Sequence, residues 1–509
     1  MRIFNTGLRV QLLRKRGFTI VELLIVIVVI GILAAITIIA YNGVVSSAAE
    51  ATLKSDLRNV QAQVAGAKET EGSYPADTST FVSSPGTVYE YDADETSYCI
   101  TASSEAAGVS FYFDSSAGVI VEGTCPGHSG IGGGSVQSGL ALASGNTHSC
   151  HLDSGNAYCW GYGPNGEMGV GVSQTETPLP VTTSGVLSGR TVTQVSRTCA
   201  LADGQVFCWG PGGFGQLGNG LGTSSSTPVA VSTSGVLSGR TVTAISSGGF
   251  QSCALADGQA FCWGAGGYTG DGTATTRNAP VAVSTSGVLS GRTVTAISSG
   301  YLHTCAIADG QAFCWGGGTS AQLGNGASSN SNVPVAVSTA GVLAGKTVTA
   351  ISAGGFNTCA IADGEVFCWG TGTNGMLGNA ASNTSNIPVA VSTSGVLSGR
   401  TVTAVTNGYV SSGSHPNCAI ADGEAFCWGL GTSGQLGNNA SSTSNVPVAV
   451  STSGVLSGLT VTDIAPSSTH TCAIANSSAY CWGSGSNGRL GDGTTTTSLI
   501  PVAVSPLPS

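Results

Sequence analysis

Cysteine forms the clearest chemical pattern in this 509-residue chain. The sequence contains 16 cysteines, and all but two fall into pairs whose members are nine positions apart. The chain has no CxxC motif and no short-spaced cysteine and histidine set of the zinc-binding type, which disfavours redox catalysis and zinc binding. We therefore predict structural disulfides and an oxidising, extracytoplasmic location. The predicted pairs are Cys99–Cys125, Cys150–Cys159, Cys199–Cys208, Cys253–Cys262, Cys305–Cys314, Cys359–Cys368, Cys418–Cys427 and Cys472–Cys481.

The spacing of nine fixes the register of the hairpin between two such cysteines. Between Cys199 and Cys208 the midpoint falls at Asp203 and Gly204, and Asp-Gly favours a two-residue type I′ turn. Counting outward places the cysteines opposite each other in a non-hydrogen-bonded pair, with Cα atoms about 4.5 Å apart. Five of the seven units have Asp-Gly at this midpoint. Each of these pairs is therefore expected to bridge adjacent strands.

Both faces of each predicted hairpin are apolar. Pleat alternation places Cys199 and Leu201 on one face, and Phe207 and Trp209 on the other. Seven tryptophans recur at intervals of 49 to 59 residues, each followed by glycine, and each unit contains four strand-like segments. Repeated four-stranded units that are buried on both sides are typical of a propeller.

The units resemble the regulator of chromosome condensation repeat family. The resemblance rests on HTCAIADGQAFCWG at 303–316, on the GGTSAQLGNG that follows and on the later VPVAV. It covers residues 139–504 and implies a closed, seven-bladed β-propeller, so we predict a mainly β fold. We also expect the last strand-like segment, 501–504, to lie beside the first, 139–144.

Three histidines recur two residues before the first cysteine of their hairpins. They belong to units that we place in non-adjacent blades, so a shared metal is disfavoured and a structural role is expected. These residues are His148, His303 and His470.

Other patterns with chemical potential also favour a non-catalytic protein. Gly210, Gly212 and Gly215 match GxGxxG, but no helical segment follows, as a dinucleotide site would require. No Ser, His and Asp set, no paired carboxylates and no metal signature are evident. We predict no enzyme activity, no cofactor and no metal. The net charge of −10 also makes nucleic acid an unsuitable partner.

The segment 18–40 is apolar and long enough to cross a membrane. Arg14, Lys15 and Arg16 precede it, which predicts a cytoplasmic N-terminus and an outside location for everything after residue 40. One carboxylate, Glu22, interrupts the apolar run, and a charge within such a helix is costly. A functional reason for Glu22 is therefore expected.

The sequence from Lys15 to Glu22 resembles the signal of the type IV prepilin family. The resemblance implies cleavage between Gly17 and Phe18 by a prepilin peptidase and N-methylation of Phe18. It also implies that Glu22 pairs with the N-terminal amine of a neighbouring pilin subunit during assembly. A plain signal anchor that tolerates Glu22 is the alternative.

After the membrane segment, the pattern predicts a small α+β region similar to a reduced pilin head. Apolar residues continue at helical spacing to about Lys68, and three strand-like segments follow. A stalk is the alternative for this region. We divide the chain into a leader at 1–17, a transmembrane and assembly helix at 18–40, a pilin-like region at 41–127, a glycine-rich linker at 128–138, the propeller at 139–504 and a tail at 505–509.

Aromatic residues in the turns before the hairpins are candidate binding residues. Phe250, Tyr301 and Phe356 occupy equivalent turns, and Tyr409 lies in a longer insertion at 406–416. They are expected to line one end of the ring, where they could anchor a ligand. Alternatively, they only cover glycine-rich turns.

These features predict an exported protein that passes once through the bacterial cytoplasmic membrane and is then displayed on the cell surface or a pilus. The first hypothesis is a minor pilin or pilus-tip adhesin whose propeller binds an unknown extracellular protein or glycan. A pseudopilin of a secretion or DNA-uptake system and a membrane-anchored propeller outside any filament are alternatives. A nucleotide-exchange role is disfavoured, because small GTPases are cytosolic.

Overall fold

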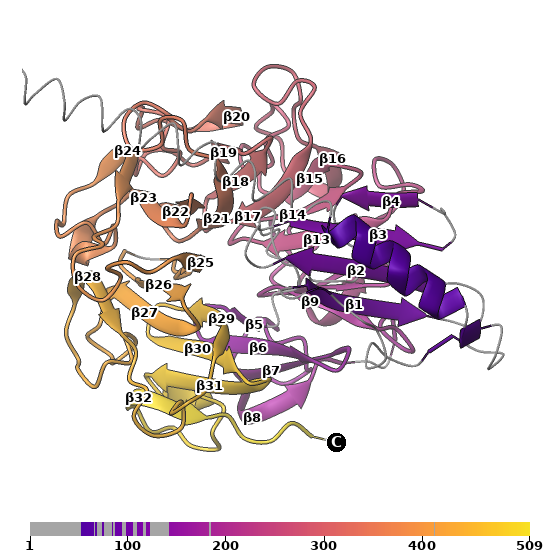
Figure 1. Cartoon of the computed structure of the whole chain (residues 1–509). Helices are drawn as coiled ribbons and strands as arrows, with labels where there is room; N and C mark the ends of the chain where they lie inside the picture. Colours follow the sequence, from indigo (N-terminus) through magenta and orange to yellow (C-terminus); the bar gives the residue numbers. More distant parts are fainter. Residues whose placement is uncertain are drawn as a thin grey trace, which may run out of the picture. The chain divides into compact units, whose positions relative to one another are not determined.

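The computed structural model describes residues 52–65, 67–68, 74–75, 84, 87–93, 98–104, 109–115, 119–122, 142–182, 185–411 and 413–508 (Figure 1). The chain divides into two compact units, Met1–Gly133 and Gly134–Ser509. The predicted domain boundaries remain predictions. Gly17, Phe18, Glu22 and the segment 18–40 lie outside the described residues.

The first unit combines one helix with a four-stranded antiparallel sheet. The helix covers residues 52–65, and Leu53, Leu57, Val60 and Val64 are fully buried, as their spacing of four, three and four predicts. They pack in one cluster with residues of the second and third strands. The strands, in sheet order, are β1 (Thr87–Ala93), β2 (Tyr98–Ser104), β3 (Val109–Asp114) and β4 (Val119–Glu122).

Two predictions for this unit are left open. Cys99 is disulfide-bonded, but its predicted partner Cys125 lies outside the described residues, so this pairing stays a prediction. Within the described part of the chain, no helix is both long and apolar enough to span a bilayer.

The second unit is a seven-bladed β-propeller, as predicted. Each blade is a four-stranded antiparallel sheet built from four consecutive strands. Blades 1 to 3 consist of β5 (Leu142–Ser144), β6 (His148–Asp153), β7 (Asn156–Tyr162) and β8 (Gln174–Pro180); β9 (Val192–Val195), β10 (Cys199–Ala202), β11 (Gln205–Gly210) and β12 (Ser225–Ala230); β13 (Val242–Ser247), β14 (Gln251–Ala256), β15 (Gln259–Gly264) and β16 (Arg277–Ala282).

The remaining blades repeat this pattern. Blades 4 to 7 consist of β17 (Val294–Ser299), β18 (His303–Ala308), β19 (Gln311–Gly316) and β20 (Ser331–Ala336); β21 (Val348–Ala353), β22 (Asn357–Ala362), β23 (Glu365–Gly370) and β24 (Ser385–Ala390); β25 (Val402–Asn407), β26 (Pro416–Ala421), β27 (Glu424–Gly429) and β28 (Ser444–Ala449); β29 (Val461–Pro466), β30 (His470–Ala475), β31 (Ser478–Gly483) and β32 (Ser498–Ala503). In each blade the first strand lies nearest the centre and the fourth lies at the outer rim (Figure 1).

The hairpin register agrees with the prediction. Cys199 lies opposite Cys208, and the two are joined by a disulfide with a Cα–Cα distance of 4.0 Å. Asp203 and Gly204 both have positive φ, 48° and 69°, as a type I′ turn requires. All seven hairpins carry such a disulfide, with Cα–Cα distances of 4.0 to 4.1 Å.

The two apolar faces of each hairpin pack against different neighbours. In blade 2, Cys199 and Leu201 belong to one buried cluster with Phe261 and Trp263 of blade 3. The opposite face, with Phe207 and Trp209, packs against blade 1. Every blade therefore presents its cystine to the tryptophan of the next blade, which is why both faces of the sequence are apolar.

The glycine-rich loop between the third and fourth strands of each blade completes the interface with the tryptophan of the next blade. Trp263 Nε1 donates a hydrogen bond of 2.9 Å to the backbone carbonyl of Gln216 in the preceding blade. Gly218 follows with a φ of +66°, and a Cβ atom there would lie 2.7 Å from the indole nitrogen. Glycine is therefore required at this position both for its backbone conformation and for its close approach to the ring.

The prediction that 501–504 lies beside 139–144 was wrong. β32 pairs with β31 at the outer edge of blade 7, whereas β5 is the innermost strand of blade 1 and contacts β29. Since every blade is already complete with four consecutive strands, no strand needs to be shared between the two ends of the chain. The ring closes through contacts between blades, including a hydrogen bond from the Leu142 N–H to Asp463.

Candidate functional site

The four predicted aromatic residues meet at one end of the propeller. Phe250 and Tyr301 have ring centroids 5.1 Å apart, and Tyr301 lies 5.9 Å from Phe356 and 6.0 Å from Tyr409. They come from the turns between the first and second strands of blades 3 to 6. The two contacts of Tyr301 with Phe356 and Tyr409 are edge-to-face, an arrangement that aromatic pairs prefer. The structure thus brings all four candidates into one group.

Phe214 extends this group and was missed by sequence reasoning. Its ring lies 4.9 Å from that of Phe250 in an edge-to-face arrangement, and the residue is 49% exposed. It comes from the loop between β11 and β12, at a position where blades 4 and 6 have Ser320 and Ser433. This departure from the serine of blades 4 and 6 is the signal in the sequence that could have identified Phe214. We call Phe214, Phe250, Tyr301, Phe356 and Tyr409 the aromatic cluster.

Arg197 was also missed, and it contacts the aromatic cluster through Tyr409. Its guanidinium carbon is 3.9 Å from the centroid of the Tyr409 ring, a cation–π contact between blades 2 and 6. Its Nη2 donates to the carbonyls of Ser247 and Ser299 in blades 3 and 4. Burial lowers the pKa of Arg197 to about 10 and raises the pKa of Tyr409 to about 12.

The alternative role of the aromatic residues, covering glycine-rich turns, is also visible. A Cβ atom on Gly249 would lie 2.5 Å from the Tyr301 ring and 2.7 Å from the Tyr409 hydroxyl. Tyr301 and Tyr409 therefore support the turns, whereas the exposed Phe214 is available to a partner. The cluster combines supporting rings with a projecting one.

Each of the three predicted histidines forms a hydrogen bond to a neighbouring blade. His303 Nε2 lies 2.8 Å from Thr358 Oγ1, His470 Nε2 lies 2.9 Å from Ser149 Oγ, and His148 Nε2 lies 2.9 Å from the Arg197 carbonyl. Burial lowers the pKa of all three, so they are neutral at pH 7.

The prediction that these histidines lie in non-adjacent blades was wrong for His148 and His470. Ring closure makes blades 7 and 1 neighbours, and His148 contributes to the lowered pKa of His470. Among the described residues, no three His, Cys, Asp or Glu side chains are grouped as a metal site. The GxGxxG residues Gly210, Gly212 and Gly215 lie at the end of β11 and in the loop that leads to β12.

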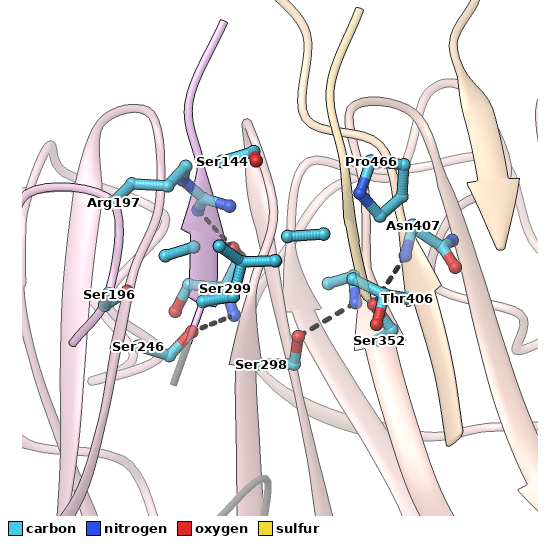
Figure 2. A pocket seen from close by; sticks show the side chains of 14 residues that line it. Ser144, Ser196, Arg197, Ser246, Ser298, Ser299, Ser352, Thr406, Asn407 and Pro466 are labelled. Atoms are coloured by element: carbon cyan, nitrogen blue, oxygen red, sulfur yellow. Dashed lines mark hydrogen bonds between the residues drawn. The ribbon is translucent and has the colours of Figure 1, made fainter. Parts of the chain in front are cut away.

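A narrow cavity lies in the central channel (Figure 2). Its volume is about 50 Å³, whereas pockets for drug-sized ligands occupy about 300 to 1,000 Å³. The cavity is lined by residues of the first strands of six blades and, in blade 2, by Ser196 and Arg197, which follow β9. It has room for a small group and none for an organic cofactor.

The opposite end of the propeller carries a ring of ion pairs. Arg240, in the linker before blade 3, lies 2.7 Å from Asp257 in the hairpin turn of that blade, and its guanidinium also lies over the Phe261 ring. Equivalent pairs precede blades 2, 4, 5 and 6. Because both partners of each pair are partly exposed to solvent, each pair contributes little to stability. The two ends therefore differ: one is aromatic and the other is ionic.

Comparison with known proteins finds a family match in each part of the chain. The regulator of chromosome condensation (RCC1) repeat family matches residues 203–255, 309–361, 363–412, 422–474 and 476–509. The prokaryotic N-terminal methylation motif matches residues 12–38. The chain is a fusion of a prepilin-type methylation motif and RCC1 repeats. Each RCC1 match begins at the first residue of a hairpin turn, so a repeat in sequence spans parts of two blades.

The chain matches its curated relatives over only part of their length. The Arabidopsis thaliana ultraviolet-B receptor UVR8 is 30% identical over 264 residues, which is 50% of this chain and 56% of the receptor. The human E3 ubiquitin-protein ligase HERC2 is 33% identical over 205 residues, which is 40% of this chain and 4% of the ligase.

Two solved structures show the same fold. Human WBSCR16 has a TM-score of 0.56 and 23% identity, over 66% of this chain and 86% of its own. Prp20p from Saccharomyces cerevisiae has a TM-score of 0.57 and 19% identity, over 69% of this chain and 85% of its own. Together with the methylation motif, these matches describe a pilin-like protein that carries an RCC1-type propeller. The motif implies processing by a prepilin peptidase and assembly with other pilins.

Proposed function

We propose that this protein is a minor pilin or pilus-tip adhesin whose propeller binds an extracellular protein or glycan through the aromatic cluster. The observation that carries the proposal is the joining of five aromatic rings at one end of a rigid scaffold, with Phe214 49% exposed. Aromatic side chains dominate binding energy at interfaces, because each ring buries a large area at a low cost in conformational entropy. The fused methylation motif provides the route to the surface.

The size of the propeller favours a low-copy position in a filament. The second compact unit extends from Gly134 to Ser509, and a head of this size at every subunit would crowd a helical filament. Tip or occasional placement avoids that crowding. The buried cystines are consistent with a location on the cell surface, since disulfides persist outside the cytoplasm.

A binding experiment with matched variants tests the role of the aromatic cluster. The full-length protein in detergent is screened against glycan arrays and against surface-protein extracts of candidate host cells. Phe214→Ser is the test variant, because the fold accepts serine at the equivalent positions of blades 4 and 6. Val236→Ala is the control, because Val236 is a 37% exposed apolar residue in a linker at the ionic end.

We expect Phe214→Ser to weaken binding about tenfold or more, and Val236→Ala to leave it unchanged. Equal binding by both variants would remove the aromatic cluster from the proposal. Whether the retained ligand is a glycan or a protein decides which class of partner the cluster recognises.

The same motif also serves pseudopilins of secretion or DNA-uptake systems, and it is compatible with a membrane-anchored propeller outside any filament. Recovery with the inner-membrane secretion ATPase rather than with sheared filaments favours the pseudopilin, and recovery from membranes alone favours the anchored propeller. We propose no enzyme activity for the protein. Nucleotide exchange or hydrolysis by the purified protein would overturn that part.

A further inference from the structure

The cavity in the central channel carries a single charged side chain among its described lining residues, and that residue is Arg197 (Figure 2). No aspartate or glutamate is among the described residues that line it. Glu167 influences the pKa of Tyr409 at this end of the ring, but its carboxylate is hydrogen-bonded to Asn165. The positive charge therefore has no counter-charge in the cavity wall.

The hydrogen bonds of Arg197 leave part of its guanidinium unused. The two carbonyls of Ser247 and Ser299 accept from Nη2 alone, while the buried Nε atom has no partner within the described part of the chain. Carbonyl dipoles only partly replace the hydration that a guanidinium loses on burial. The remaining cost shows in the lowered pKa of Arg197.

Serine hydroxyls give the cavity further donors. Ser246, Ser298 and Ser352 occupy the same position in three consecutive blades, and all three line the cavity. Each Oγ atom accepts a hydrogen bond from a backbone N–H of the next blade, at 2.8 to 2.9 Å. Because the oxygen is used as an acceptor, the hydroxyl proton remains available to donate. The wall of the cavity is therefore rich in donors and carries one positive charge.

We propose that the central channel binds one small anionic group, with Arg197 supplying the charge and the three serine hydroxyls donating hydrogen bonds. The volume of about 50 Å³ fits a chloride ion or a carboxylate group, since one water molecule occupies about 30 Å³ of liquid. The anion is either a free ion or the carboxylate of a larger acidic ligand. This site is independent of the proposed pilus role, because it requires only the folded propeller.

Thermal melting at constant ionic strength tests the site. The full-length protein in detergent is melted in a bulky sulfonate buffer such as HEPES, and the sulfonate is then replaced by chloride or by acetate. The test variant is Arg197→Gln, because Gln251 occupies the equivalent position in blade 3 and bonds to blade 4 there. The control is Arg240→Gln, which removes one arginine at the ionic end.

We expect chloride, acetate or both to raise the melting temperature of the parent and of Arg240→Gln by about 1 to 3 °C, and to leave Arg197→Gln unchanged. A response to both anions indicates a site for free ions, and a response to acetate alone indicates the carboxylate of a larger ligand. No response in the parent, or an equal response in Arg197→Gln, would overturn the proposal. If the variant does not fold, broadening of the chloride resonance or of the acetate methyl resonance by the parent supports the site, and the absence of broadening for both anions overturns it.

Discussion

Trp160 in the first blade donates its indole N–H to the backbone carbonyl of Arg489 in the last blade, at 3.2 Å. The same bond joins Trp263 to Gln216 within the ring, at 2.9 Å. Gly491 also meets the Trp160 ring as Gly218 meets Trp263. The closing interface is therefore built like the internal ones, although its partners are more than 300 residues apart in the chain.

The indole hydrogen bond can be tested with two matched tryptophans. Both Trp263 and Trp315 are fully buried, but within the described residues the Nε1 atom of Trp315 has no hydrogen-bond partner. Replacement by phenylalanine removes similar volume at both sites and a hydrogen bond only at Trp263. We therefore expect Trp263→Phe to lower the free energy of unfolding by about 1 kcal/mol more than Trp315→Phe. Equal urea midpoints for the two variants would show that this bond does not stabilise the blade interface.

The hairpin cystines should each stabilise the propeller. Cys253 and Cys262 are buried and enclose a loop with a sequence separation of 9. Replacing both with alanine should lower the free energy of unfolding by about 2 to 3 kcal/mol, because the unfolded chain gains conformational freedom. Urea denaturation of the variant and the parent measures the difference. An unchanged midpoint would mean that this cross-link is energetically idle.

The local structure of the blades could be predicted from the sequence because it depends on short-range rules. The distance from Cys199 to Cys208 and the Asp-Gly pair between them determine one register, and strand pleating then assigns every side chain to a face. The same reasoning predicted the buried helical stripe that begins at Leu53. These rules do not extend from one blade to the next.

Acid should destabilise the propeller through its buried histidines. Burial lowers the pKa of His303 from 6.5 to about 3, so between these values the unfolded chain binds more protons than the folded one. The contribution of neutral His303 to the free energy of unfolding is therefore complete above about pH 6.5 and is lost as the pH falls toward 3. By about pH 5 the lost contribution is about 2 kcal/mol.

A single variant isolates this effect. Asn357 occupies the equivalent position in the next blade, so His303→Asn should be tolerated and should lack the titrating group. Comparing urea midpoints at about pH 7.5 and about pH 5, we expect a smaller loss of stability for His303→Asn than for the parent. The same loss in both proteins would exclude His303 as a source of the acid sensitivity.

The parts of the site that escaped prediction are made across the ring. Arg197 and Tyr409 are in contact although blades 3, 4 and 5 lie between them in sequence order, and no local sequence pattern predicts such a contact. Phe214 was missed because it belongs to a different loop type from Phe250. The closure was mispredicted for the same reason: strand pairing is local, whereas blade packing depends on the whole ring.

The intact mass of the native protein decides whether it is a processed pilin that carries a propeller. The protein is isolated separately from sheared surface filaments and from membranes of the same cells. We expect a filament-associated species that begins at N-methylated Phe18, with its cysteines oxidised. A species that is found only in membranes and retains residues 1–17 would show that the protein is not a processed pilin.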